Sequence, residues 1–121
     1  MTSHEADGTS LRHTAAECVD LVHAHRVFPY LPFTFQCRYF MEMIRITRPE
    51  GWIVFDIMSE DCMSEILLEK WIASQRYDPC LMPHKFVTDL FVRRQCSLRW
   101  NFFIPFLPGQ TEYLVFAKDK G

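Results

Sequence analysis

The chain has 121 residues, a length typical of one domain. Apolar residues make up 49% and charged residues 23%, which favours a packed globular core over disorder. The net charge of −2 carries no electrostatic signature of nucleic-acid or anionic-membrane binding. The five cysteines include no C-x-x-C pair, and the opening residues 1–6 are polar, unlike a signal peptide. We therefore expect a single cytoplasmic domain over residues 1–121 with separate, reduced thiols.

The first half alternates short apolar bursts with helical periodicity. Residues 18–25 (CVDLVHAH) have the pattern of a buried parallel strand, and Pro29 and Pro32 break the following segment into a loop. Apolar residues then recur at helical spacing over 33–47, which predicts an amphipathic helix of about four turns that Pro49 ends. Residues 52–58 (WIVFDIM) are β-branched and aromatic, and they predict a second buried strand.

A second helix is expected after this strand, with Ser59 or Asp61 as its N-cap. Its apolar positions share one face: Met63, Ile66, Leu67 and Trp71. Pro83 is then expected in the first turn of a short helix that holds Phe86, Leu90 and Phe91.

The last third alternates side chains with the period of two that is typical of strands. One set comprises Leu98, Trp100, Phe102 and Ile104, and the other Tyr113, Val115 and Ala117. Residues 105–109 connect the two runs, so the pattern predicts a β-hairpin. The whole order predicts an α/β sheet with a parallel crossover and an antiparallel closing hairpin. We expect a three-layer sandwich reduced to about four strands, with helices on both faces where the chain supplies them.

Three stretches in this order resemble the C-terminal portion of the class I S-adenosylmethionine (SAM) dependent methyltransferases. Residues 7–11 followed by 18–25 resemble the acidic turn after the family's third strand, and its fourth strand. Residues 42–56 (EMIRITRPEGWIVFD) resemble the Arg-x-Leu-(Arg/Lys)-Pro-Gly-Gly turn before its fifth strand, although Glu50 stands where glycine is usual. Residues 111–118 resemble its closing strand. The resemblance implies a partial Rossmann-like sheet, SAM as cofactor and methyl transfer to an unidentified small-molecule acceptor.

One part of the family's cofactor site has no counterpart in this sequence. The family site starts with a strand and a Gly-x-Gly loop, where glycine lets the backbone approach the cofactor closely. Here glycine occurs only at positions 8, 51, 109 and 121. We therefore expect the chain alone to be inactive. Three hypotheses follow: a fragment of an enzyme, a noncatalytic α/β binding or dimerisation module, or one half of an enzyme whose companion chain supplies the loop.

The resemblance also implies cofactor-binding residues. Asp7 would accept a hydrogen bond from the adenine amino group, and Gly8 and Thr9 would offer backbone groups nearby. The backbone of Ala24 would face the methionine moiety. The competing interpretation is that Asp7 belongs to a frayed terminus.

His23 and His25 are the candidate catalytic residues. They stand two apart at the carboxyl end of a predicted strand, so they share one side of it, and ligands of open α/β sheets bind beyond that edge. A neutral imidazole there can act as a general base while the other histidine contacts the substrate. The alternatives are two histidines with local hydrogen bonds, or a metal pair for which no third ligand is evident.

Four further residues have expected places around these histidines. Arg26 and Tyr30 would line the substrate side, and Asp20 would orient loops at the start of the first strand. Asp56 would be either a buried polar group or a group at the pocket rim, and a buried carboxylate needs partners. In addition, an unpaired edge on the strand at 18–25 would favour pairing with a second copy or a companion chain.

Overall fold

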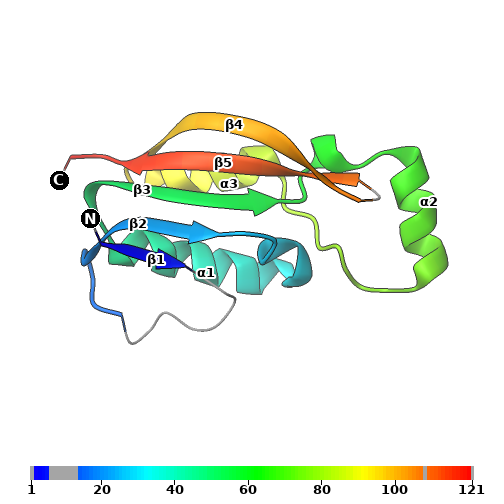
Figure 1. Ribbon diagram of the computed structural model, residues 1–121, viewed down its shortest axis with the longest axis horizontal. Helices are drawn as coiled ribbons and strands as arrows, with labels where there is room; N and C mark the ends of the chain where they lie inside the picture. Colours follow the sequence, from blue (N-terminus) through cyan, green and yellow to red (C-terminus); the bar gives the residue numbers. More distant parts are fainter. Residues whose placement is uncertain (1, 6–13, 108, 121) are drawn as a thin grey trace.

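The structure, a computed structural model, describes residues 2–5, 14–107 and 109–120 (Figure 1). Five strands form one sheet in the order β1-β2-β3-β5-β4, with these bounds: β1 Ser3–Glu5, β2 Val19–Ala24, β3 Thr47–Ile57, β4 Cys96–Phe106 and β5 Gly109–Lys118. The three helices are α1 Phe33–Ile46, α2 Glu65–Ser74 and α3 His84–Arg93. Two short 3₁₀ turns cover Phe28–Tyr30 and Glu60–Cys62. None of the described helices is long and apolar enough to span a bilayer.

The sheet combines a parallel half with an antiparallel half. β1 pairs with β2 and β2 with β3 in parallel, while β5 runs antiparallel to both β3 and β4. Helix α1 connects the parallel strands β2 and β3. The expected α/β class, the parallel crossover and the closing hairpin are therefore confirmed. The sheet has five strands rather than about four.

An aromatic cluster holds the helices against the sheet. Five phenylalanines without solvent exposure form it: Phe28, Phe40, Phe55, Phe91 and Phe116. Phe40 of α1 lies 4.9 Å from Phe55 of β3 between ring centroids, and Phe91 of α3 lies 4.2 Å from Phe116 of β5. Because both contacts involve the same side of the sheet, α1 and α3 cover one face together.

The opposite face of the sheet is not covered by any described helix, so the expectation of three layers was wrong. Figure 1 shows α1 and α3 on one side of the strands. Alternation along the strands turns these apolar and aromatic side chains to the other side: Leu21, Trp52, Val54, Trp100, Phe102, Ile104, Tyr113 and Val115. We call this the open face. Trp100 is 63% exposed and stacks on Trp52 at a centroid distance of 5.9 Å.

The edge of β2 is not free, contrary to the sequence-based expectation. Residues 3–5 pair with it in parallel, with Ser3 opposite Leu21 and Glu5 opposite His23. Backbone hydrogen bonds from Asp20 and Leu21 to the Thr2 carbonyl extend this contact. Three polar residues show no strand pattern, which is why the sequence did not predict β1. This short polar strand occupies the position beside β2 and protects the edge.

Several element boundaries differ from the expected ones. The N-cap of α2 is Ser64, whose hydroxyl accepts the Leu67 amide at 3.1 Å, whereas Ser59 and Asp61 lie in the preceding 3₁₀ turn. Within α2 only Leu67 is buried, so its predicted apolar face is largely exposed. Pro83 directly precedes α3 as its N-cap residue.

A bulge in β4 alters the predicted alternation of the hairpin. Leu98 pairs with Phe116 and Trp100 with Val115, so one extra residue, Arg99, interrupts the register. Leu98 therefore packs against the covered core, while Trp100 turns to the open face. The sequence pattern had placed both on one face.

An irregularity near the start of β3, where its register with β2 shifts, gives Glu50 a backbone conformation that suits glycine. Glu50 has φ of 69°, a left-handed conformation that disfavours any residue with a Cβ. At Gly51 the limit is space, because a Cβ there would lie 2.7 Å from Thr47 Cγ2 and 2.9 Å from the Asp20 carbonyl oxygen. Position 50 would therefore favour a glycine that the sequence does not have, whereas position 51 requires the glycine that is present.

Substitutions at these neighbours should have opposite effects. We expect Glu50→Gly to raise the free energy of unfolding by about 1 kcal/mol, because it removes the left-handed strain at some entropic cost. We expect Gly51→Ala to lower it by about 1–3 kcal/mol through overpacking. Urea denaturation of the two variants measures both. Equal signs for the two changes would contradict this account of the turn.

The five cysteines are free, and Cys62 and Cys96 are buried. Burial raises the pKa of the Cys96 thiol from 9.0 to about 11, although the nearby Lys118 opposes the shift. The folded state therefore keeps this proton over a range in which the unfolded chain releases it, so folding stability must fall as pH rises from about 9 to about 11.

Cys96→Ala should flatten this alkaline loss of stability. We expect wild type to lose more stability than the variant between about pH 8 and about pH 10.5, because only wild type buries this thiol. Urea denaturation at both pH values gives the comparison, and Cys18→Ala is the control because Cys18 lies half-buried. Parallel losses in wild type and Cys96→Ala would show that Cys96 does not titrate as described.

Candidate functional site

The two candidate histidines meet in a hydrogen-bonded line at the carboxyl end of β2. His23 Nδ1 lies 3.1 Å from His25 Nε2, and His25 Nδ1 lies 3.1 Å from the hydroxyl oxygen of Tyr113 on β5. The histidine rings are 5.1 Å apart between centroids, with planes at 56°. The line therefore runs along the open face from β2 across β3 to β5, and His25 is its middle member.

Tyr113 is held by packing as well as by this hydrogen bond. Its ring stacks on Phe102 of β4 at a centroid distance of 5.3 Å and an interplanar angle of 3°. Burial, and then the charge of Asp56, raise the pKa of the Tyr113 hydroxyl, and Arg26 opposes them weakly. Tyr113 is therefore a neutral phenol at physiological pH.

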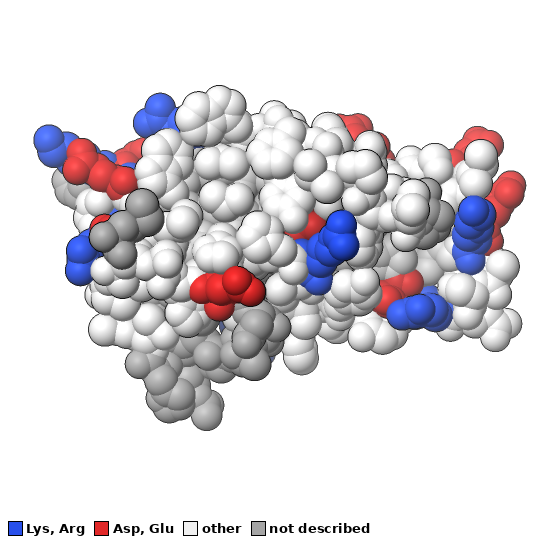
Figure 2. Space-filling view, viewed as in Figure 1, with Lys and Arg blue, Asp and Glu red and all other residues white. Residues whose placement is uncertain are grey.

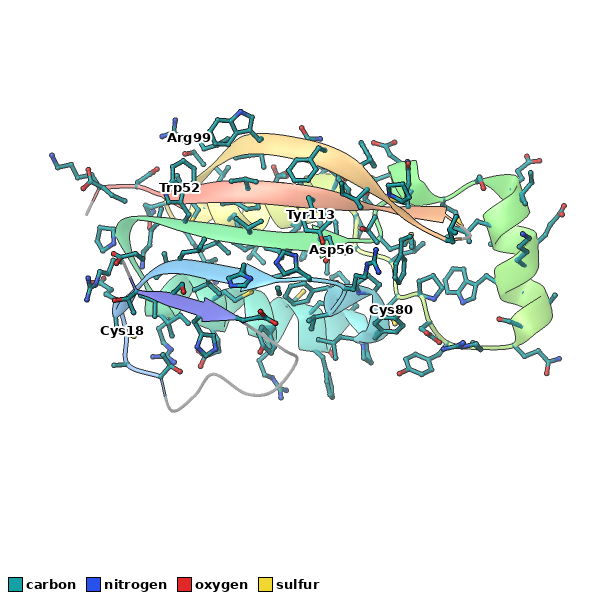
Figure 3. The ribbon with its side chains drawn as sticks, in the orientation of Figure 1. Cys18, Trp52, Asp56, Cys80, Arg99 and Tyr113 are labelled. Carbon is teal, nitrogen blue, oxygen red and sulfur yellow. The ribbon has the colours of Figure 1, made fainter. Side chains whose placement is uncertain are left out.

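Asp56 lies directly opposite Tyr113 in the register of β3 and β5, and its side chain has no solvent exposure (Figure 3). Its Oδ1 accepts the backbone N–H of Arg26 at 2.7 Å, which anchors this residue, the second after β2, in a left-handed conformation with φ of 56°. Its Oδ2 has no hydrogen-bond partner among the described residues. Asp56 is therefore a buried polar group and not a group at the pocket rim, and it holds the loop beside the histidines.

The side chains of Arg26 and Tyr30 reach the hairpin that closes the sheet. The Arg26 guanidinium lies 5.1 Å above the Phe106 ring and donates to the Pro105 carbonyl at 3.4 Å. The Tyr30 ring lies 6.1 Å from the Phe106 ring. Tyr30 also borders a hollow of about 130 Å³ with seven other residues: Met58, Leu67, Arg76, Asp78, Pro79, Phe106 and Leu107. The hollow adjoins the carboxyl end of the sheet but is small for a complete ligand.

The predicted cofactor residues are only partly within the described chain. Asp7, Gly8 and Thr9 lie outside it. Ala24 ends β2, and its side chain is buried in the core, so only its backbone faces the sheet edge. No glycine loop follows β1 or β2 in the described ranges. Of the predicted cofactor residues, the described part of the chain therefore contains Ala24 alone.

Asp20 has the structural role that was expected at the start of β2. Its carboxylate accepts the Thr2 amide at 2.8 Å and lies 3.5 Å from an Arg48 guanidinium nitrogen. The Thr2 hydrogen bond, more than the Arg48 charge, lowers the pKa of Asp20. It thus links β2 to the residue before β1 and to the start of β3.

A second polar cluster lies on the covered side and was not predicted. The Glu112 carboxylate is 1% exposed and accepts three hydrogen bonds: from Ser59 Oγ at 2.6 Å, His84 Nδ1 at 2.8 Å and Asn101 Nδ2 at 2.9 Å. Because three donors already satisfy it, this carboxylate joins β5 to β4, to α3 and to the residue before the 3₁₀ turn at Glu60–Cys62 rather than facing a ligand. In the described ranges no group of three His, Cys, Asp or Glu side chains is arranged to hold a metal ion.

Sequence reasoning missed Tyr113 as a site residue, because alternation in the closing strand identifies only its face. Its place beside His25 results from the strand order β2-β3-β5, which joins residues 88 positions apart. The one available signal was that Tyr113 carries the polar side chain among the apolar residues of that face.

Comparisons with known proteins identify the fold. No protein-family model and no curated protein sequence matches this chain. Among solved structures, a SAM-dependent methyltransferase from Methanosarcina mazei matches with a TM-score of 0.74 and 8% identity over 96% of this chain and 66% of its own. Magnesium protoporphyrin IX methyltransferase from Synechocystis PCC 6803 with bound S-adenosylhomocysteine matches with 0.72 and 8%, over 92% of this chain and 49% of its own.

A third match is the complex between the Trm112 methyltransferase activator and a methyltransferase from Haloferax volcanii, with a TM-score of 0.66, 14% identity, and coverage of 96% of this chain and 60% of the other. These matches show that the chain has the class I SAM-dependent methyltransferase fold over most of its length. It spans less than two thirds of each of these three structures.

Proposed function

We propose that this chain provides the acceptor side of a SAM-dependent methyltransferase and is inactive by itself. The observation that carries the proposal is the His23–His25–Tyr113 line at the carboxyl end of β2, where an open α/β sheet binds its ligands. The methyltransferase fold supplies the reaction class. When bound, SAM supplies an electrophilic methyl group, and the protein aligns the acceptor and accepts its proton.

The residues toward the cofactor are the backbone of Ala24 and, outside the described ranges, Asp7, Gly8 and Thr9. The acceptor in this proposal is a small molecule with an O–H or N–H group. The aromatic rings of Phe102 and Tyr113 and the hollow beside Tyr30 support this class, because flat or apolar groups pack against such surfaces. His25 and His23 serve as the base system.

The cofactor proposal predicts weak and localised binding. We expect SAM to bind the isolated chain only in the millimolar range, roughly −4 kcal/mol, because one wall of the site is absent. In amide NMR spectra the shifted signals should belong to residues 7–9 and 23–26. S-adenosylhomocysteine should give the same pattern.

ATP is the matched control, since it shares the adenosine but not the methionine moiety. Micromolar SAM binding would contradict the incomplete site. No shift at residues 23–26 with SAM would favour the noncatalytic module instead.

A second candidate function is a binding or dimerisation module derived from a methyltransferase, and the open face favours it. Figure 2 shows this side of the molecule as a mostly uncharged area. Its exposed members include Trp52, Trp100, Phe102 and Ile104, at 37–63% exposure. Contiguous aromatic surfaces of this kind mark protein interfaces.

For the isolated chain we propose a second copy as the occupant of the open face. A second copy presents the same apolar and aromatic side chains, and two sheets can pack face to face about 10 Å apart. The proposed homodimer thus forms through the face of the sheet and not through the edge of β2, which β1 occupies.

Sedimentation velocity at high protein concentration tests the homodimer. We expect wild type to sediment as a dimer and Trp100→Glu as a monomer, because the carboxylate would be desolvated in the contact. Val92→Glu is the control, since Val92 is 58% exposed on α3 on the covered side. A monodisperse wild-type monomer, or equal dissociation of both variants, would contradict this interface.

A further inference from the structure

Both ring nitrogens of His25 are already engaged within the protein. Nε2 faces His23 Nδ1 and Nδ1 faces the Tyr113 hydroxyl, each at 3.1 Å. A histidine in this position has no ring nitrogen free to take a proton directly from a substrate. A proton can enter or leave only at the two ends of the line. These ends are His23 Nε2 and the second lone pair of Tyr113 Oη.

The direction of the line is set by the tautomer of His25, and the single hydrogen of Tyr113 is compatible with one consistent arrangement. The phenol retains that hydrogen, because burial and the neighbouring Asp56 raise its pKa. His25 Nδ1 is the hydrogen-bond partner found for this hydroxyl among the described residues, and Asp56 Oδ2 remains without a partner. If Tyr113 donates to Nδ1, neutral His25 carries its hydrogen on Nε2 and donates it to His23 Nδ1. Neutral His23 then carries its hydrogen on Nε2.

We propose that Tyr113, His25 and His23 form a proton relay in which Tyr113 is the group that faces the methyl acceptor and His23 is the exit to solvent. The role of this relay in catalysis rests on the proposed methyl transfer, whereas the hydrogen-bonded arrangement does not. It reassigns the roles of the two histidines, since neither contacts the acceptor as a base. Tyr113 receives the acceptor's proton and His25 is a positioning and relay residue.

The proton balance of the relay closes. The acceptor O–H or N–H bond breaks, and its electron pair stays on the acceptor atom to bond the methyl carbon of the sulfonium donor, which leaves as a neutral thioether. The released proton bonds to Tyr113 Oη while the phenol hydrogen moves to His25 Nδ1. The hydrogen on His25 Nε2 moves to His23 Nδ1, and His23 becomes an imidazolium that loses its Nε2 hydrogen to water.

The surroundings of the relay suit transient charge at the His23 end. Glu5 of β1 stands opposite His23 in the register, so a carboxylate lies on the neighbouring strand. At the other end, Asp56 lies opposite Tyr113 in the register, and both Asp56 and Arg26 interact electrostatically with its hydroxyl. Stacking on Phe102 fixes the phenol ring, so the hydroxyl remains oriented toward His25.

The test is long-range ¹H–¹⁵N NMR of the histidine rings in the chain as it stands, at about pH 8, where an ordinary imidazole is neutral. We expect His25 and His23 both to carry hydrogen on Nε2, with each Nδ1 shifted by an accepted hydrogen bond. Tyr113→Phe keeps the stacked ring but removes the hydroxyl. It should move the His25 Nδ1 resonance toward that of a free pyridine-type nitrogen.

His25→Gln should likewise release His23 Nδ1, and it assigns the signals. Tyr77→Phe is the control, because Tyr77 is 70% exposed and its hydroxyl contacts the Tyr30 carbonyl instead. Hydrogen on His25 Nδ1 in wild type, or an unchanged Nδ1 shift in Tyr113→Phe, would overturn the relay. A SAM titration of the same sample reports separately on the proposed function, so the two can fail independently.

Discussion

The aromatic cluster on one face of the sheet is the constraint on which the rest depends. Phe55 contacts Phe28, Phe40, Phe91 and Phe116, so one β3 side chain joins α1, α3 and β5. Burying these rings fixes β2, β3 and β5 side by side, and that order brings the carboxyl end of β2 close to Tyr113. The same arrangement leaves the other face without a helix. Both the polar line and the apolar surface around it follow from this one-sided packing.

The open face combines two properties that usually exclude each other. Its tryptophans and Phe102 favour removal from water, whereas in the proposed relay His23, His25 and Tyr113 need room for a substrate and a path for protons. A partner that covered the aromatic end near Trp52 and Trp100 would lower the polarity around the relay without blocking the carboxyl edge. Hydrogen bonds within the relay would then strengthen, because their strength rises as the local dielectric constant falls.

The proposed methyl transfer requires side chains only to align the acceptor and to remove one proton. That requirement makes a relay sufficient and a strong nucleophile unnecessary, in agreement with the buried, protonated Cys96. The satisfied Glu112 cluster on the other side of the sheet illustrates the contrast. Its carboxylate is fully hydrogen-bonded and holds elements together. At the relay, by comparison, hydrogen-bonding positions remain available at both ends.

The sequence by itself determined the α/β class, the β2–α1–β3 crossover and the closing hairpin, because local periodicity and proline positions encode them. It also placed His23 and His25 two residues apart at the end of a predicted strand. Tertiary structure decided what depends on contacts between distant residues. The bulge at Arg99 sends Leu98 and Trp100 to opposite faces, and three polar residues become β1 only because the edge of β2 is there to pair with. Tyr113 meets His25 only because β3 and β5 lie between β2 and β4 in the sheet, an order that no local pattern specifies.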